Sequence, residues 1–166
     1  MVLKHMFGEE CLFFTETDTS KNQIDIRLAT GRTIEVRSSC VRNGIEFAVF
    51  MKNKEIDGQQ YFDVIGPYTN GYKPGESFKD YYMRVLYHCD KREFMRTILG
   101  RDEIVLYITG GATEAMMKNP DYYQIKHLTP AGGEVQRESD YQVIPLGKSL
   151  DFHEFLEVIG RENLLL

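Results

Sequence analysis

The chain has 166 residues, 42% of them apolar and 27% charged, and its 20 Lys and Arg against 25 Asp and Glu give a net charge of −5. This composition is ordinary for a globular protein and argues against a disordered tail, a collagen-like repeat or a membrane-spanning protein. The acidic balance also argues against a protein held to nucleic acid mainly by attraction to phosphates, which usually carries a basic excess. The length predicts one domain, residues 1–166, with a core large enough to fold without disulfides.

The three cysteines, Cys11, Cys40 and Cys89, are odd in number and form no Cys-x-x-Cys pair. Neither a disulfide framework nor a zinc ribbon is therefore predicted, and free thiols are typical of a reducing compartment. Residues 1–10 lack the apolar core of a signal peptide, and no apolar run approaches the roughly 20 residues of a membrane helix. We therefore expect a cytoplasmic protein with no membrane partner.

The first 65 residues have the patterning of a β-sheet. Five segments are apolar or alternate between apolar and polar residues: 11–17, 23–29, 33–37, 45–51 and 61–65. Strands of this kind, joined by short turns, predict an antiparallel meander with one buried and one solvent-facing side. Alternation places Asp25, Arg27, Glu35 and Arg37 on the solvent-facing side.

After a Gly- and Pro-rich loop at 66–75, the pattern changes to helices with a few strands. The predicted elements are a helix from 78 to about 90, a second helix ending at 100, a strand at 103–109, helices at 112–118 and from 120 to about 128, an edge strand at 141–146 and a last helix ending at 160. Ser149 is the predicted cap of the last helix and Gly160 its end. The sequence therefore predicts an α+β fold, in which an N-terminal antiparallel meander of about five strands precedes helices with one or two extra strands.

A possible ligand site lies where the strand at 103–109 meets Gly110 and Gly111 before a helix start. Glycines permit close approach of a ligand, and free amides at a helix start attract phosphate. Five residues form this candidate site: Thr109, Gly110, Gly111, Thr113 and His127. In this hypothesis His127 or Asp102 acts as the base. The alternative is a tight strand-to-helix turn with Thr113 as the cap, because the segment lacks the full phosphate-binding motifs.

A possible interaction surface combines mixed charge with exposed aromatic residues. Its predicted members are Arg27, Arg37, Phe50, Tyr68 and Tyr72. Tyrosine is typical of contact surfaces because it offers apolar area with a polar tip. The alternative is cross-strand ion pairs of little energetic worth.

No complete catalytic or metal-ligating motif is present, so no cofactor and no metal are predicted, and whether the protein is an enzyme stays open. The first hypothesis is a non-enzymatic cytoplasmic interaction domain that binds a protein partner or itself. The alternative is an enzyme or sensor for a phosphate-bearing small molecule, with its site at 108–114. Nucleic acid is not an expected partner.

Overall fold

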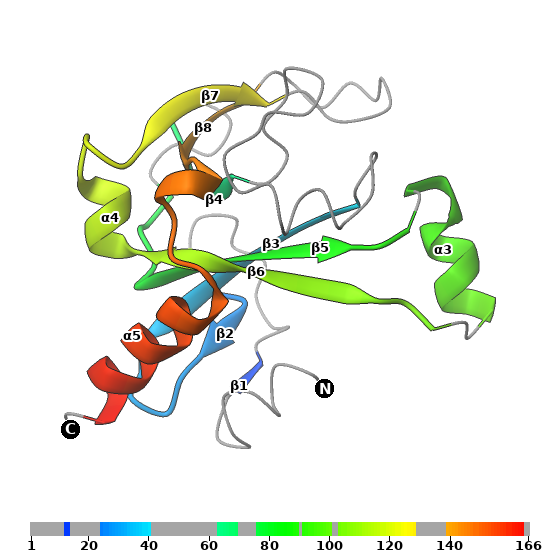
Figure 1. The fold of residues 1–166 in the computed structure, drawn as a ribbon, viewed down its shortest axis with the longest axis horizontal. Helices are drawn as coiled ribbons and strands as arrows, with labels where there is room; N and C mark the ends of the chain where they lie inside the picture. The colour runs from blue at the N-terminus through cyan, green and yellow to red at the C-terminus, as the bar shows by residue number, and fades with distance from the viewer. Residues whose placement is uncertain are drawn as a thin grey trace.

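A computed structural model describes residues 12–13, 24–40, 63–69, 76–89, 91–100, 103–128 and 139–164. Within these ranges the chain forms two β-sheets together with helices (Figure 1), which confirms the predicted α+β class.

The larger sheet has five strands in the order β1-β2-β3-β5-β6. Their bounds are Leu12–Phe13 for β1, Ile26–Arg27 for β2, Thr33–Cys40 for β3, Tyr81–Tyr87 for β5 and Leu106–Thr113 for β6. The strands β1, β2 and β3 pair antiparallel, but β3 and β5 run parallel. The predicted meander does not extend to the next described strand, β4, because β4 joins the other sheet. The strand predicted at 45–51 lies outside the described residues.

The smaller sheet is antiparallel and has the order β4-β8-β7, with β4 at Val64–Tyr68, β8 at Ser139–Ile144 and β7 at Gln124–Leu128. Two predictions are wrong here. The predicted edge strand is the central strand β8, because Pro145 follows the strand and leaves its ladder intact. The helix predicted up to residue 128 is β7, because its backbone finds its partners along β8.

The helix predicted from 78 to about 90 is also wrong. Tyr81–Tyr87 is the strand β5, which lies between β3 and β6 and is buried on both faces over residues 81–86. Aromatic and β-branched side chains favour such a strand. The helix α3 (Lys91–Gly100) then follows, and it confirms the second predicted helix.

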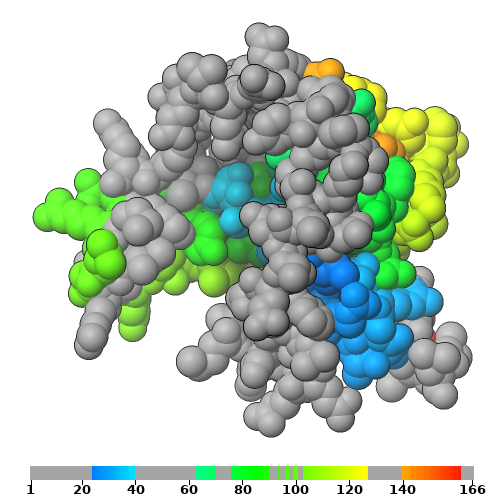
Figure 2. Space-filling view, turned by 180° about the vertical axis from the view of Figure 1, so that it is seen from behind, coloured from blue at the N-terminus to red at the C-terminus, as the bar shows by residue number. Residues whose placement is uncertain are grey.

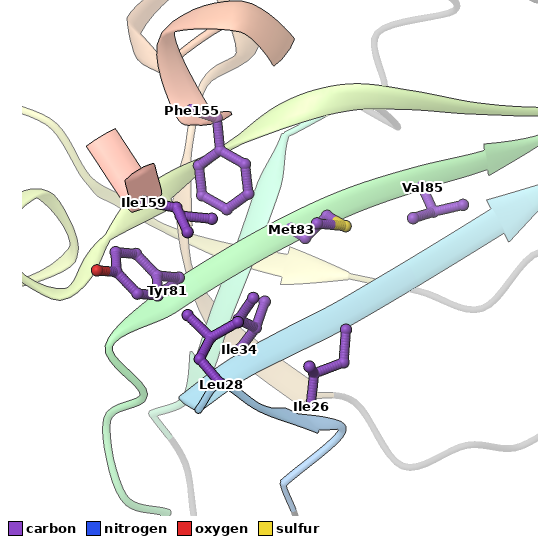
Figure 3. Packing of buried hydrophobic residues seen from close by; sticks show 8 residues of the cluster. All are labelled: Ile26, Leu28, Ile34, Tyr81, Met83, Val85, Phe155 and Ile159. Atoms are coloured by element: carbon purple, nitrogen blue, oxygen red, sulfur yellow. The ribbon is translucent and has the colours of Figure 1, made fainter. Parts of the chain in front are cut away.

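The apolar core lies on one face of the larger sheet, under the helix α5 (Phe152–Leu164) (Figure 1). Figure 3 shows eight side chains of this core, from β2 and the residue that follows it, β3, β5 and α5: Ile26, Leu28, Ile34, Tyr81, Met83, Val85, Phe155 and Ile159. The smaller sheet lies across the opposite face of the larger one. A second apolar cluster joins the two sheets and the short helix α4 (Glu114–Lys118): Val64, Tyr82, Ala112, Met117 and Ile144.

The start of α5 is held by a reciprocal cap. The amide of Glu154 donates to Asp151 Oδ1 at 2.9 Å, and the amide of Asp151 donates to Glu154 Oε2 at 2.8 Å. The predicted cap Ser149 is wrong, since its hydroxyl donates to the carbonyl of Leu146 instead, and the helix continues past Gly160.

We expect Asp151→Ala to lower the free energy of unfolding by about 1 kcal/mol, because the amide of Glu154 at the helix start loses its side-chain acceptor. Urea unfolding measures this value. The control is Glu157→Ala on the same helix, which removes only an exposed ion pair with Arg161 and should cost about 0.5 kcal/mol or less. Equal costs for the two variants would contradict the capping role.

Candidate functional site

Charged side chains of β3 and β5 point into the space between the two sheets. Glu35 and Arg37 lie on β3, and Arg84 lies beside Arg37 on β5. The prediction that Glu35 and Arg37 face solvent is wrong, because the smaller sheet covers this face. Glu35 is only 6% exposed, and the side chain of Arg37 is 23% exposed. We call the following six residues the inter-sheet charged cluster: Glu35, Arg37, Asp63, Glu76, Arg84 and Lys126.

Arg37 is the centre of this cluster. Its Nη2 lies 2.9 Å from Glu35 Oε1 and 3.3 Å from Glu76 Oε1. Its guanidinium also lies 5.6 Å from the ring centroid of Tyr68, whose ring in turn contacts Tyr141 at a centroid distance of 4.2 Å. Burial alone would lower the pKa of Arg37, but the two carboxylates outweigh burial and raise this pKa above its ordinary value. Arg37 therefore stays charged at the inner surface of the site.

Glu76 fixes the position of Arg37. Its Oε2 accepts a hydrogen bond from the amide of Tyr68 at 2.9 Å, while its Oε1 faces Arg37. The carboxylate is thus anchored to the backbone of β4 and contacts the same guanidinium nitrogen, Nη2, as Glu35 does. This arrangement leaves Arg37 little freedom to turn.

Glu35 is the titratable group of the cluster. Burial, with smaller contributions from the nearby carboxylates of Asp25 and Glu76, raises its pKa to about 7, against the lowering effects of Arg37 and Lys79. Its Oε1 pairs with Arg37, whereas its buried Oε2 has no hydrogen-bond partner among the described residues. A carboxyl with this pKa can both give up and take a proton near neutral pH.

The deeper part of the cluster is formed by Arg84, Asp63 and Lys126. Arg84 is fully buried and donates to the carbonyl of Arg37 at 3.1 Å and to the hydroxyl of Ser39 at 2.9 Å. Burial lowers its pKa to about 10, against the favourable charge of Asp63. Lys126 reaches from β7 to Asp63 at 2.9 Å, and burial still raises the pKa of that carboxyl. These groups connect β3, β5 and β7 across the gap between the sheets.

Part of β3 is visible at the surface in the view from behind (Figure 2). The strand that carries Glu35 and Arg37 therefore reaches the surface.

The glycines of the sequence-predicted ligand site contact the protein's own chain. The amide of Gly111 donates to the carbonyl of Leu150 at 3.1 Å, and an added Cβ on Gly110 would lie 2.1 Å from the same oxygen. Thr113 accepts from the amide of Met116 and caps α4, as the alternative predicted. The hydroxyl of Thr109 donates to the carbonyl of Arg84 at 3.5 Å. These contacts give a phosphate no free amide at Gly111.

The remaining predicted residues are spread over several elements. The backbone of His127 lies on β7, in the other sheet from the glycines, and its side chain is outside the described part of the structure. Arg27 on β2 donates to the carbonyl of Gly31 at 2.9 Å. Of the predicted interaction surface, Arg37 and Tyr68 come together in the cluster, while Phe50 and Tyr72 lie outside the described residues.

The described ranges lack both a metal-binding cluster and a membrane-spanning helix. No group of three His, Cys, Asp or Glu side chains there could hold a metal ion. None of the helices in those ranges combines the length and the apolar character needed to cross a bilayer.

Comparison with known proteins gives one relative. The chain is similar to the uncharacterized protein MJECS01 of Methanocaldococcus jannaschii, with 26% identity over an alignment 171 positions long, which covers 87% of this chain and 56% of that protein. The chain thus spans little more than half the length of this relative. No protein-family model and no solved structure matches the chain. Its function is therefore argued from the site alone.

Proposed function

We propose that the inter-sheet charged cluster is an acid–base site for a small anionic molecule, with Glu35 as the proton carrier and Arg37 as the anion-binding group. One observation carries this proposal. Glu35 Oε2 is buried and has no hydrogen-bond partner among the described residues, although Oε1 of the same carboxyl lies 2.9 Å from Arg37. Buried polar atoms in native proteins nearly always have a partner. A hydrogen-bonding group of a substrate would satisfy this oxygen.

The chemistry of the neighbouring groups supports the same assignment. A planar guanidinium recognises phosphate or carboxylate through paired hydrogen bonds, and Glu76 holds that of Arg37 in place. A carboxyl of pKa about 7 is suited to general acid–base catalysis at neutral pH. Strongly shifted pKa values beside a specific charge partner are a feature of functional sites. The proposal keeps the predicted class of ligand and moves its site from 108–114 to the cluster.

The interaction-domain hypothesis remains a second proposal with less support from the described side chains. Arg37 and Tyr68, two of its predicted contact residues, contact each other and the carboxylates between the sheets. Residues committed to such internal contacts are poor anchors for a flat protein surface.

A thermal-shift screen with phosphorylated and carboxylated metabolites tests the binding part of the proposal. We expect at least one such compound to raise the melting temperature of the wild-type protein. Arg37→Lys keeps the charge but loses the planar fork, and should weaken the binding of that compound about tenfold or more. The matched control is Arg27→Lys on β2, which should bind as the wild type does. Equal affinities of the two variants, or a screen without any hit, would contradict the proposal.

Glu35→Gln tests the proton-transfer part. The glutamine amide has the shape of the carboxyl but neither gives up nor takes a proton near neutral pH. The variant should therefore still bind the compound and should fail to convert it. Product formation is followed by NMR of the incubated compound. Conversion by Glu35→Gln at the wild-type rate would exclude Glu35 as the proton carrier.

A further inference from the structure

The strand β6 lies at an edge of the five-stranded sheet. It pairs with β5 on one side, and on its other side the described residues provide only the single bridge between Gly111 and Leu150. The amide of His88 donates to the carbonyl of Val105 at 2.9 Å. Because the direction of backbone groups alternates along an antiparallel ladder, the amides of Leu106 and Ile108 point away from β5. This edge thus offers backbone donors to another strand.

The edge has neither lysine nor proline at residues 104–108, and the irregularity in the pairing of β6 with β5 lies beyond them, at Thr109. Residues 104–108 read Ile-Val-Leu-Tyr-Ile, with no charge and no proline. Val105 is 51% exposed there, and Leu99 at the end of α3 is 75% exposed. Natural proteins place lysine, proline or a bulge on an exposed edge to prevent pairing with another chain. An apolar edge of this kind is typical of a strand that is paired in the assembled protein.

The two ends of β6 carry opposite charge. Figure 1 shows α3 at one end of the β5–β6 ladder and α5 near the other. The helix α3 has a net charge of +2, from Lys91, Arg92 and Arg96 against Glu93, and α5 has a net charge of −2, from Glu154, Glu157 and Glu162 against Arg161. Antiparallel pairing of β6 with the same strand of a second copy would place each α3 toward the α5 of the other copy. A two-fold axis makes this contact self-complementary.

We infer that the protein forms a symmetric dimer in which β6 pairs antiparallel with β6 of a second copy and α3 faces α5 across the interface. Among the described residues the backbone edge is open at Leu106–Ile108. This edge, its apolar sequence and the opposite charges at its ends all favour a second copy of this chain as the occupant. This inference does not depend on the proposed function, because the inter-sheet charged cluster lies on a face of the sheet and not at this edge.

Sedimentation velocity over a range of concentrations tests the dimer. We expect the wild-type protein to dimerise, and Val105→Lys to raise the dimer Kd about tenfold or more, because a lysine on an edge strand opposes its pairing with another strand. The matched control is Ile125→Lys. Ile125 is 53% exposed and lies on β7, which is an edge strand of the other sheet. This change should leave the dimer Kd unchanged.

Arg96→Glu tests the interface at a second position, on α3. Its side chain is exposed on α3, so the change should not affect folding, and it should weaken the dimer most strongly at low salt. Circular dichroism confirms that each variant is folded. A wild-type protein that stays monomeric at every concentration would overturn the inference, and so would a dimer that is weakened by Ile125→Lys but not by Val105→Lys.

Discussion

Gly111→Ala is expected to lower the free energy of unfolding by about 3 kcal/mol, the upper end of the usual cost of overpacking a core. A Cβ at this position would lie 2.4 Å from the carbonyl oxygen of Tyr82 and 2.5 Å from Cε2 of Phe155. The first atom belongs to the interior strand β5, and the second to a buried ring of α5. Neither can move without disturbing the main apolar core.

The matched control is Gly160→Ala in α5, where no atom of the described residues, apart from the neighbouring backbone of the helix itself, lies within 4 Å of the added Cβ. This variant should be about 0.5–1 kcal/mol more stable than the wild type, because alanine favours a helix over glycine. Urea unfolding of the three proteins measures both values. Equal stability of Gly111→Ala and the wild type would contradict the close packing of α5 on β6. A substitution of Gly111 is therefore a probe of folding and cannot serve as a selective probe of ligand binding.

The glycine pair illustrates what a local pattern contains. Two adjacent glycines correctly indicate that something approaches the backbone closely. The group that approaches is Leu150 with the start of α5, about forty residues further along the chain. A local motif contains no information about such a distant partner. The same pair of glycines is therefore expected whether a ligand or the chain's own helix approaches the backbone.

The strand β5 was missed for a related reason. A strand buried on both faces lacks the alternation of apolar and polar residues that identifies a half-buried strand. A short apolar run of this kind is equally consistent with a buried helix. The parallel pairing of β5 with β3 is also non-local, since more than forty residues separate the paired positions. The helices α3 and α5 were predicted more successfully because their signals lie within their own sequence.

The candidate site was predicted in part. Alternation along β3 correctly places Glu35 and Arg37 on the face opposite the apolar core formed by Ile34 and its neighbours. What alternation cannot show is that a second sheet covers this face. One signal was present in the sequence: Arg84 interrupts an otherwise apolar and aromatic run. A charged residue at the centre of a buried strand needs charged or polar partners, which is a reason to search for a buried cluster.

The stability of the wild-type protein is expected to fall as the pH rises from about 4.5 to about 7, through the titration of Glu35. The pKa of this carboxyl is about 7 in the folded protein and 4.5 as the ordinary value, so the folded state binds more protons than the unfolded state between these limits. The free energy of unfolding therefore decreases with pH in this window and levels off above it. A shift of this size corresponds to a total loss of about 3 kcal/mol.

Glu35→Gln isolates this contribution, because glutamine does not titrate while every other group remains. Burial also raises the pKa of Asp63, so the titration of Asp63 likewise lowers the free energy of unfolding as the pH rises. This second contribution is the same in the variant and in the wild type. Unfolding in urea at about pH 5 and about pH 8 should show the variant gaining up to about 3 kcal/mol on the wild type between the two conditions. Parallel stability profiles would contradict a buried carboxyl with a raised pKa. A gain at high pH would mean that the ionised carboxylate weakens the fold, and a group retained at such a cost is typical of a residue that serves function and not stability.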